Sequence, residues 1–112
     1  MKVTAVAKDI GIPSRKVRLA VDMVRGKKVE EALSMLQFVP TASARAVSKV
    51  IKSAAANAEN NFEMTPADLK IVDIQANEGH TLKRYRAQGR GRVNPILKRS
   101  THIVVSVDEE GI

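Results

Sequence analysis

The segment from Gly79 to Arg99 has seven basic side chains and no acid, which makes it the part of this chain best suited to binding chemistry. The seven are Lys83, Arg84, Arg86, Arg90, Arg92, Lys98 and Arg99. The other basic residues are balanced by the 12 acids, so the formal net charge of +7 belongs to this segment. Arginine offers planar donors that match phosphates, and lysine offers a point charge. Tyr85, the single tyrosine, can stack on a base.

A polyanion is therefore the expected ligand of this basic segment, with nucleic acid ahead of an anionic membrane. The alternative is a solvated run of charge. It is disfavoured because seven cations without an acid repel one another unless a polyanion neutralises them. No apolar run approaches the roughly 20 residues that span a bilayer, and the first residues lack the apolar core of a signal peptide.

A second basic cluster lies near the start of the chain, and Asp22 is the one acid within it. It comprises Arg15, Lys16, Arg18, Arg25, Lys27 and Lys28, and Ser14 directly precedes it. Ser14 to Arg18 form the first turns of a predicted helix, where free N–H groups already favour anions. We expect phosphate contacts here, with an ordinary solvated helix face as the alternative. For a third stripe, Arg45, Lys49 and Lys52, the sequence leaves both interpretations open.

The sequence offers little support for catalysis or metal binding. His80 and His102 are the two histidines and lie far from the i, i+4 spacing of a metal pair on one helix, and there is no cysteine. For both histidines, a phosphate or backbone hydrogen bond, or plain exposure, is preferred to a metal role. No nucleophile elbow is present, and the glycines around Arg90 match neither a phosphate loop nor a dinucleotide fingerprint. We predict no enzyme activity, no metal and no cofactor.

The elements that must position these residues can be predicted from periodicity. We expect a strand at 3–7, a helix at 14–26 capped by the Ser14 hydroxyl, and a helix at 29–38. A third helix, capped by Thr41 or Ser43, runs to Asn60, and strands follow at 69–76 and 101–107. Gly26 suits the left-handed conformation that ends a helix.

This order predicts an α+β fold: a small three-stranded antiparallel sheet packed on three helices, with a long protruding basic β-hairpin. Residues 1–112 form one domain, in which residues 79–100 are the extended RNA-binding hairpin. Aromatic residues make up only 3% of the chain, so the core is expected to be aliphatic. The turn is expected near Gln88 to Gly91. In the free protein we expect strand order to fade beyond Gly79 and before Ser100.

Four stretches, SRKVRLAVDMVRGKKVEEAL (14–33), KVIKSAAANAENN (49–61), NEGHTLKR (77–84) and GRVNPILKRSTHIVV (91–105), resemble the family of large-subunit ribosomal protein twenty-two (L-twenty-two), of bacterial or organellar type. The resemblance implies a compact domain on the outside of the large ribosomal subunit, in the cytoplasm or an organelle, near the exit of the nascent-peptide tunnel. It implies a hairpin that reaches inward through ribosomal RNA and helps assembly. Implied partners are large-subunit ribosomal RNA, neighbouring ribosomal proteins and the nascent peptide.

The resemblance also assigns roles within the hairpin. It implies a tip of Gln88, Gly89, Arg90 and Gly91 that lines the tunnel. Positions matching Leu82, Lys83 and Arg84 carry macrolide resistance in that family. Relatives usually have Pro-Arg-Ala before the second glycine, where this chain has Ala87, Gln88 and Gly89. The tip of this chain therefore has one cation and one proline fewer than the tip of those relatives.

The sequence thus predicts a structural RNA-binding protein of the large ribosomal subunit. The predicted rRNA-binding residues are Ser14, Arg15, Lys16, Arg18, Arg25, Lys27, Lys28, His80, Lys83, Arg84, Arg86, Arg90, Arg92, Lys98 and Arg99. The alternative is a freestanding RNA chaperone or architectural nucleic-acid-binding protein. A third class, an RNA-modifying enzyme, lacks any recognisable motif.

Overall fold

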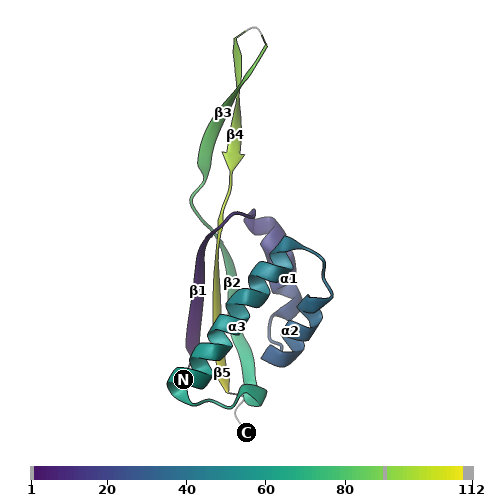
Figure 1. Ribbon diagram of the computed structural model, residues 1–112, viewed down its shortest axis with the longest axis vertical. Helices are drawn as coiled ribbons and strands as arrows, with labels where there is room; N and C mark the ends of the chain where they lie inside the picture. The colour runs from purple at the N-terminus through teal and green to yellow at the C-terminus, as the bar shows by residue number, and fades with distance from the viewer. Residues whose placement is uncertain (1, 90, 110–112) are drawn as a thin grey trace.

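Five strands and three α-helices are formed by the residues that this computed structural model describes, 2–89 and 91–109. In chain order they are β1 (Val3–Ile10), α1 (Ser14–Val24), α2 (Val29–Gln37), α3 (Ala42–Phe62), the 3-10 turn η1 (Pro66–Asp68), β2 (Leu69–Glu78), β3 (Leu82–Gln88), β4 (Arg92–Lys98) and β5 (Thr101–Glu109). Three strands form an antiparallel sheet in the order β1-β5-β2, and β3 pairs with β4 in a separate ribbon. Figure 1 shows the ribbon projecting from the end of the sheet where β2 ends and β5 begins. The predicted α+β architecture is confirmed.

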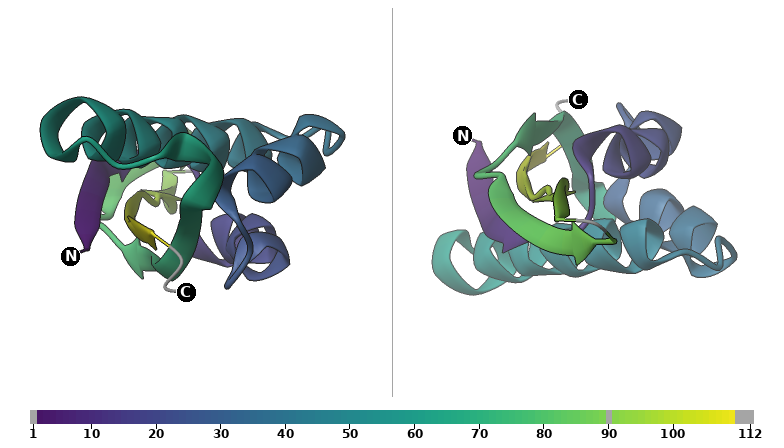
Figure 2. Two further views of the ribbon diagram at one scale, coloured as in Figure 1. Left: turned by 90° about the horizontal axis from the view of Figure 1, so that it is seen from below. Right: turned by 90° about the horizontal axis from the view of Figure 1, so that it is seen from above.

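The helices cover one face of the sheet, as the views along the long axis show (Figure 2). Each helix buries one apolar stripe, whose members are at most 2% exposed. They include Val17, Val21 and Val24 of α1, Leu36 of α2, and Val47 and Ile51 of α3. Residues at this spacing share one side of a helix. Small residues of α3, Ala54 and Ala58, are fully buried and allow close approach to the sheet.

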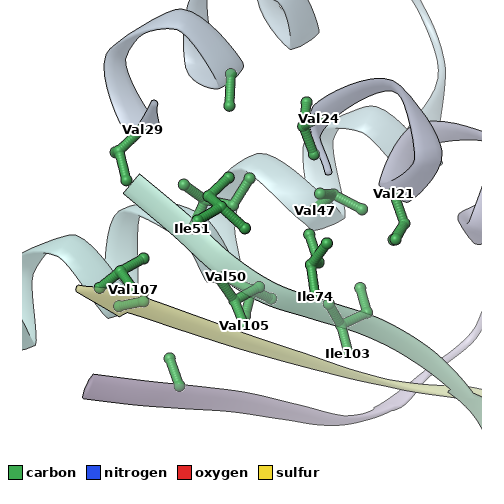
Figure 3. Close-up of a cluster of buried hydrophobic side chains, with 14 of the residues drawn as sticks. Val21, Val24, Val29, Val47, Val50, Ile51, Ile74, Ile103, Val105 and Val107 are labelled. Carbon is green, nitrogen blue, oxygen red and sulfur yellow. The ribbon is translucent and has the colours of Figure 1, made fainter. Parts of the chain in front are cut away.

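The core is aliphatic, as predicted. Its largest fully buried side chains include Ile51 of α3, Ile74 of β2, and Ile103, Val105 and Val107 of β5. Figure 3 shows the side chains of β2 and β5 pointing toward those of the three helices. β5 is the central strand, and Ile103 lies opposite Ala7 of β1 and Ala76 of β2. The core is therefore centred on β5, which begins at Thr101, shortly after β4 of the ribbon ends at Lys98.

The predicted helix boundaries hold with two corrections. Thr41 caps α3 through its hydroxyl, which accepts from the Ala44 N–H (3.1 Å). Ser14 does not cap α1, because Pro13 occupies the cap position and the Ser14 side chain is buried inside the first turn. The Pro13 carbonyl accepts from the Lys16 and Val17 N–H groups instead. Gly26 has φ +77°, as predicted, and Glu63 at φ 52° ends α3 two residues later than expected.

The predicted hairpin is formed by two paired strands, β3 and β4. The expectation that strand order fades beyond Gly79 in the free protein stays a prediction, which hydrogen exchange would test. Seven residues of β3 pair with seven of β4, from Leu82 opposite Lys98 to Gln88 opposite Arg92. The register explains how a basic ribbon forms. Each cation lies opposite a neutral residue, as with Lys83 opposite Leu97 and Arg84 opposite Ile96. Directly opposed like charges, which destabilise a strand pair, are thereby avoided.

The ribbon gives the molecule an elongated shape with extents of 67 × 26 × 17 Å. Its radius of gyration is 17.1 Å, against roughly 13 Å for a compact chain of about 100 residues. Much of the basic segment therefore lies well outside the body formed by the helices and the three-stranded sheet.

We expect the body to fold without the ribbon. Deleting residues 82–96 and joining the strands by a short turn should preserve a single cooperative thermal transition, followed by circular dichroism. The reason is that the buried core identified among the described residues draws on no residue between 79 and 100. A shorter loop also lowers the entropic cost of closure, by about 0.6 kcal/mol for each halving of its length. Loss of the cooperative transition would show that the body depends on the ribbon.

Candidate nucleic-acid interface

A groove of about 1140 Å³ lies where the start of α1, the end of β1 and the base of the ribbon meet. Its basic lining comes from both clusters found in the sequence: Arg15 and Arg18 from α1, and His80, Lys98 and Arg99 from the ribbon base. The fold thus brings together residues more than 60 positions apart. Asp9 and Glu78 are the acids among its lining residues. A groove with this excess of cations can seat a phosphate backbone.

The cations of the groove and the ribbon are available to a ligand. Arg15, Lys16, Lys83, Arg84, Lys98 and Arg99 are exposed. Within residues 2–89 and 91–109, the ion pairs that form involve other residues, Arg25 with Asp22 and Lys27 with Glu31. Without carboxylate partners, these exposed groups keep their full attraction for an outside anion.

Arg18 and Arg25 have an additional role that the sequence did not predict. The Arg18 Nε donates to the Ala76 carbonyl (3.2 Å), and the Arg25 Nη1 donates to the Ile74 carbonyl (2.9 Å). Both carbonyls belong to β2, which lies at an edge of the three-stranded sheet. Unpaired edge groups invite pairing with another chain. The two arginines therefore attach α1 to this edge and cover it, and both remain exposed enough to meet a ligand.

The segment between α1 and α2 covers the same β2 edge nearer the start of that strand. The Ile71 N–H donates to the Lys27 carbonyl (3.0 Å), and Lys28 forms a bridge with Lys70. The Lys27 Nζ lies 3.9 Å from the Glu31 carboxylate. Lys27 and Lys28 are thus held by their backbone to β2, at a distance along the strand from the groove. The structure does not bring these two lysines together with the groove cations.

The ribbon joins the sheet through a short segment that we call the neck, residues 79–81 and 99–101. The Gly79 N–H donates to the Ser100 carbonyl (2.9 Å), and the Ser100 hydroxyl donates to the His80 carbonyl (2.6 Å). The buried Thr101 hydroxyl donates to the Ile12 carbonyl (2.6 Å). These bonds tie both arms of the ribbon to each other and to the segment between β1 and α1, so they set how the ribbon leaves the body.

His102 supports the neck from the adjoining strand. Its Nδ1 accepts a hydrogen bond from the Asp9 N–H (3.1 Å), and Asp9 has a φ of 57°. This backbone hydrogen bond is one of the alternatives that the sequence left open for the histidines. Sequence reasoning missed the neck residues Ser100 and Thr101. The hydrogen bond of Ser100 joins residues 20 positions apart, and that of Thr101 joins residues 89 positions apart, so no local pattern indicates such pairs.

The tip of the ribbon is described in part. Gly89 and Gly91 lie in the turn, and Gly91 has φ +76°, a conformation that glycine adopts readily. Arg90, predicted to bind RNA and to form part of the tip, lies outside the described residues. The same holds for the side chains of Arg86, Gln88 and Arg92, whose backbone pairing alone is described.

We expect Gly79→Ala to lower the free energy of unfolding by about 1–3 kcal/mol, because a methyl group does not fit there. A Cβ at this position would lie 2.6 Å from the Ser100 hydroxyl oxygen and 3.1 Å from a ring carbon of His102. Denaturant unfolding measures the loss. Gly11→Ala is the control, since its Cβ would meet nothing within 4 Å. Equal effects of the two substitutions would contradict a tightly packed neck.

Within the described residues, no helix is long and apolar enough to cross a membrane, and no group of three acidic or histidine side chains is arranged to hold a metal ion.

Comparison with known proteins agrees with the resemblance. The family model described as Ribosomal protein L22p/L17e matches residues 5–108. A protein of Dehalococcoides mccartyi named large ribosomal subunit protein uL22 is 65% identical over 107 residues, which cover 96% of this chain and 98% of that protein. Proteins of the same name from Pediococcus pentosaceus and Ligilactobacillus salivarius are each 50% identical to this chain, and the match covers 90% of the length of each of those proteins. The chain therefore belongs to the ribosomal protein L22p/L17e family.

Proposed function

We propose that this protein is a structural constituent of the large ribosomal subunit that binds large-subunit ribosomal RNA and helps its assembly. The observation that carries the proposal is the groove at the neck, where cations of α1 and of the ribbon face one ligand site without carboxylate partners. Its family is one of structural ribosomal proteins and not of enzymes. The relatives named uL22, which match nearly the whole chain, support the placement in the large subunit.

The two basic regions have different roles in this proposal. The groove, with Arg15 and Arg18 at the start of α1, seats the body on the RNA backbone. Free N–H groups in the first turn of α1 add to the attraction for phosphate. Because phosphate contacts fix position without reading bases, the groove orients the protein and the ribbon then follows a path set by the neck.

The ribbon is proposed to run through ribosomal RNA and to line the nascent-peptide tunnel near its tip. Its length supports this role, because it carries cations well beyond the body. Cations such as Lys83 and Arg84 meet phosphates along the way, and the exposed Tyr85 can stack on a base. Neighbouring ribosomal proteins and the nascent peptide are the further partners that this placement brings.

Cosedimentation with large subunits through a high-salt wash tests the proposal. We expect the protein to remain bound, whereas a freestanding RNA chaperone, the alternative, would leave a free pool. Arg15→Ala with Lys16→Ala should increase the fraction washed off. The matched control replaces Lys2 and Lys8. Lys8 lies in β1 and Lys2 directly precedes it; both are exposed, and neither lines the groove. A wild-type protein found mainly in the free pool would contradict the ribosomal assignment.

A deletion of Leu82, Lys83 and Arg84 should move the tip and change the response of ribosomes to macrolides, while subunits still assemble. Side chains alternate between the two faces of a strand, so removing an odd number of residues inverts the faces of the rest of β3 relative to β4. Drug inhibition of ribosomes carrying the variant measures the effect.

The matched control for this deletion removes two residues, Lys83 and Arg84, and so preserves the alternation of β3. It shortens the ribbon with less disturbance of its faces, and a smaller change in drug response is expected. An unchanged response of ribosomes that contain the three-residue deletion would contradict a tunnel-lining ribbon.

A further inference from the structure

A second groove, of about 940 Å³, lies between α2 and α3, on elements that contribute nothing to the groove at the neck. Its apolar lining is Leu33, Leu36, Val39 and Pro40, from α2 and the connection to α3. Its basic lining is Arg45, Lys49 and Lys52, all exposed. Glu30 is the one acid among its described lining residues. The groove thus combines an apolar wall with three cations from one helix.

The placement of these cations is unfavourable for α3 itself. Arg45, Lys49 and Lys52 follow a spacing of four and three residues, so they lie on one side of the helix and repel one another. Arg45 lies near the N-terminus of α3, where a positive charge opposes the helix dipole, and the first turn has no acid. In the described part of the chain none of the three forms an ion pair with a carboxylate. An anionic ligand in the groove would remove both penalties.

An exposed aromatic residue is the sequence neighbour of two residues that line the groove. Phe38 lies between the lining residues Gln37 and Val39 and is 81% exposed, more than Leu19 at 71% or Tyr85 at 68%. A phenyl ring this exposed contributes little to the core and leaves a large apolar face in water. Base stacking on aromatic side chains is the common way in which proteins hold unpaired nucleotides.

We propose that the groove between α2 and α3 binds an unpaired stretch of ribosomal RNA, with one base stacked on Phe38 and the backbone along Arg45, Lys49 and Lys52. This inference rests on the proposed RNA-binding function and adds a contact separate from the neck and the ribbon. A single strand fits better than a duplex, because a paired base cannot reach the ring. RNA fits better than an acidic protein segment, because an exposed aromatic ring and three cations on the same pair of helices and their connection can meet a base and its phosphates.

The test is chemical probing of large subunits reconstituted with the full chain, using a reagent that modifies unpaired bases. Two variants address the groove: Phe38→Ala, and the triple substitution Arg45→Gln, Lys49→Gln and Lys52→Gln. All four side chains are exposed, so neither variant should have a thermal transition below that of the wild type, and the triple variant, which relieves the repulsion within α3, can have a slightly higher one. Phe62→Ala is the control for Phe38, since Phe62 is a 47% exposed phenylalanine at the opposite end of α3. A second triple variant, Lys83→Gln, Arg84→Gln and Lys98→Gln, reports on the ribbon.

We expect both groove variants to lose protection of one shared, short set of nucleotides, with Phe62→Ala losing none and the ribbon variant losing a different set. If the ribbon variant exposes nucleotides and the groove variants expose none, the groove inference is wrong while the proposed function stands. If the wild-type protein itself protects no nucleotide, the proposed function fails and this inference fails with it. If the groove variants instead lose a cross-link to a neighbouring protein with RNA reactivity unchanged, the groove binds protein and not RNA.

Discussion

If the protein binds ribosomal RNA as proposed, raising the salt concentration from 50 to 200 mM is expected to weaken that binding by about a thousandfold. The expectation follows from counterion release, which contributes a slope of roughly −0.7 to −0.9 per phosphate contact to the plot of log affinity against log salt. If about seven cations meet phosphates, the slope is roughly −5 to −6. The structure supports such a number, because the described cations of the groove and ribbon are exposed and lack carboxylate partners.

Fluorescence anisotropy with a labelled fragment of large-subunit RNA measures this slope. The variant lacking residues 82–96 is the informative comparison, because it removes Lys83, Arg84, Arg86, Arg90 and Arg92. It keeps the cations that line the groove at the neck. Its slope should be less negative by about 4. A slope near zero for the intact protein would point to apolar or protein-mediated docking and would contradict the phosphate-binding role of the basic residues.

Ile103→Ala is the single substitution with the largest expected loss of stability, about 2–5 kcal/mol in the free energy of unfolding. Ile103 is fully buried in the central strand β5, and its cross-strand neighbours Ala7 and Ala76 are too small to fill the cavity. A domain of this size has a total stability of only about 5–15 kcal/mol. The variant should therefore show a clearly lower urea midpoint and a reduced yield of assembled subunits.

Val6→Ala is the matched control for this core substitution. Val6 lies in the neighbouring strand β1, and its side chain is 51% exposed. Its truncation leaves no closed cavity, and a loss under about 1 kcal/mol is expected. Similar losses from the two substitutions would show that the sheet is not packed against the helices as the structure describes.

Local chemistry in the sequence accounts for most of the fold. The apolar stripe of α1, the Thr41 cap and the left-handed Gly26 each depend on neighbours within a few residues, and each is found in the structure. The Ser14 cap failed because Pro13 supplies the first helical carbonyl, a competition between adjacent residues that propensity alone does not resolve. The protruding hairpin was predicted from its charge and its flanking strands, but its register was not, because register relates residues on two strands.

The cations of the candidate site can be picked out from the sequence, but their assembly into one groove cannot. The abundance of cations in two stretches indicates phosphate binding without any knowledge of the fold. That Arg15 and Arg99 share one groove follows only from the packing of α1 against the base of the ribbon. The edge-covering bonds of Arg18 and Arg25 were missed for the same reason, since their acceptors lie 58 and 49 residues away along the chain.

Because the neck separates the ribbon from the sheet, the reach of this protein can be altered independently of its fold. Adding one residue to each arm lengthens the ribbon by about 3.3 Å and exchanges the faces beyond the insertion, while adding two to each lengthens it by about 6.6 Å and restores them. Ribbons of different length and composition can therefore be carried on one unchanged body. Such grafts would provide a graded series of probes, each extending a known distance from a fixed anchoring point.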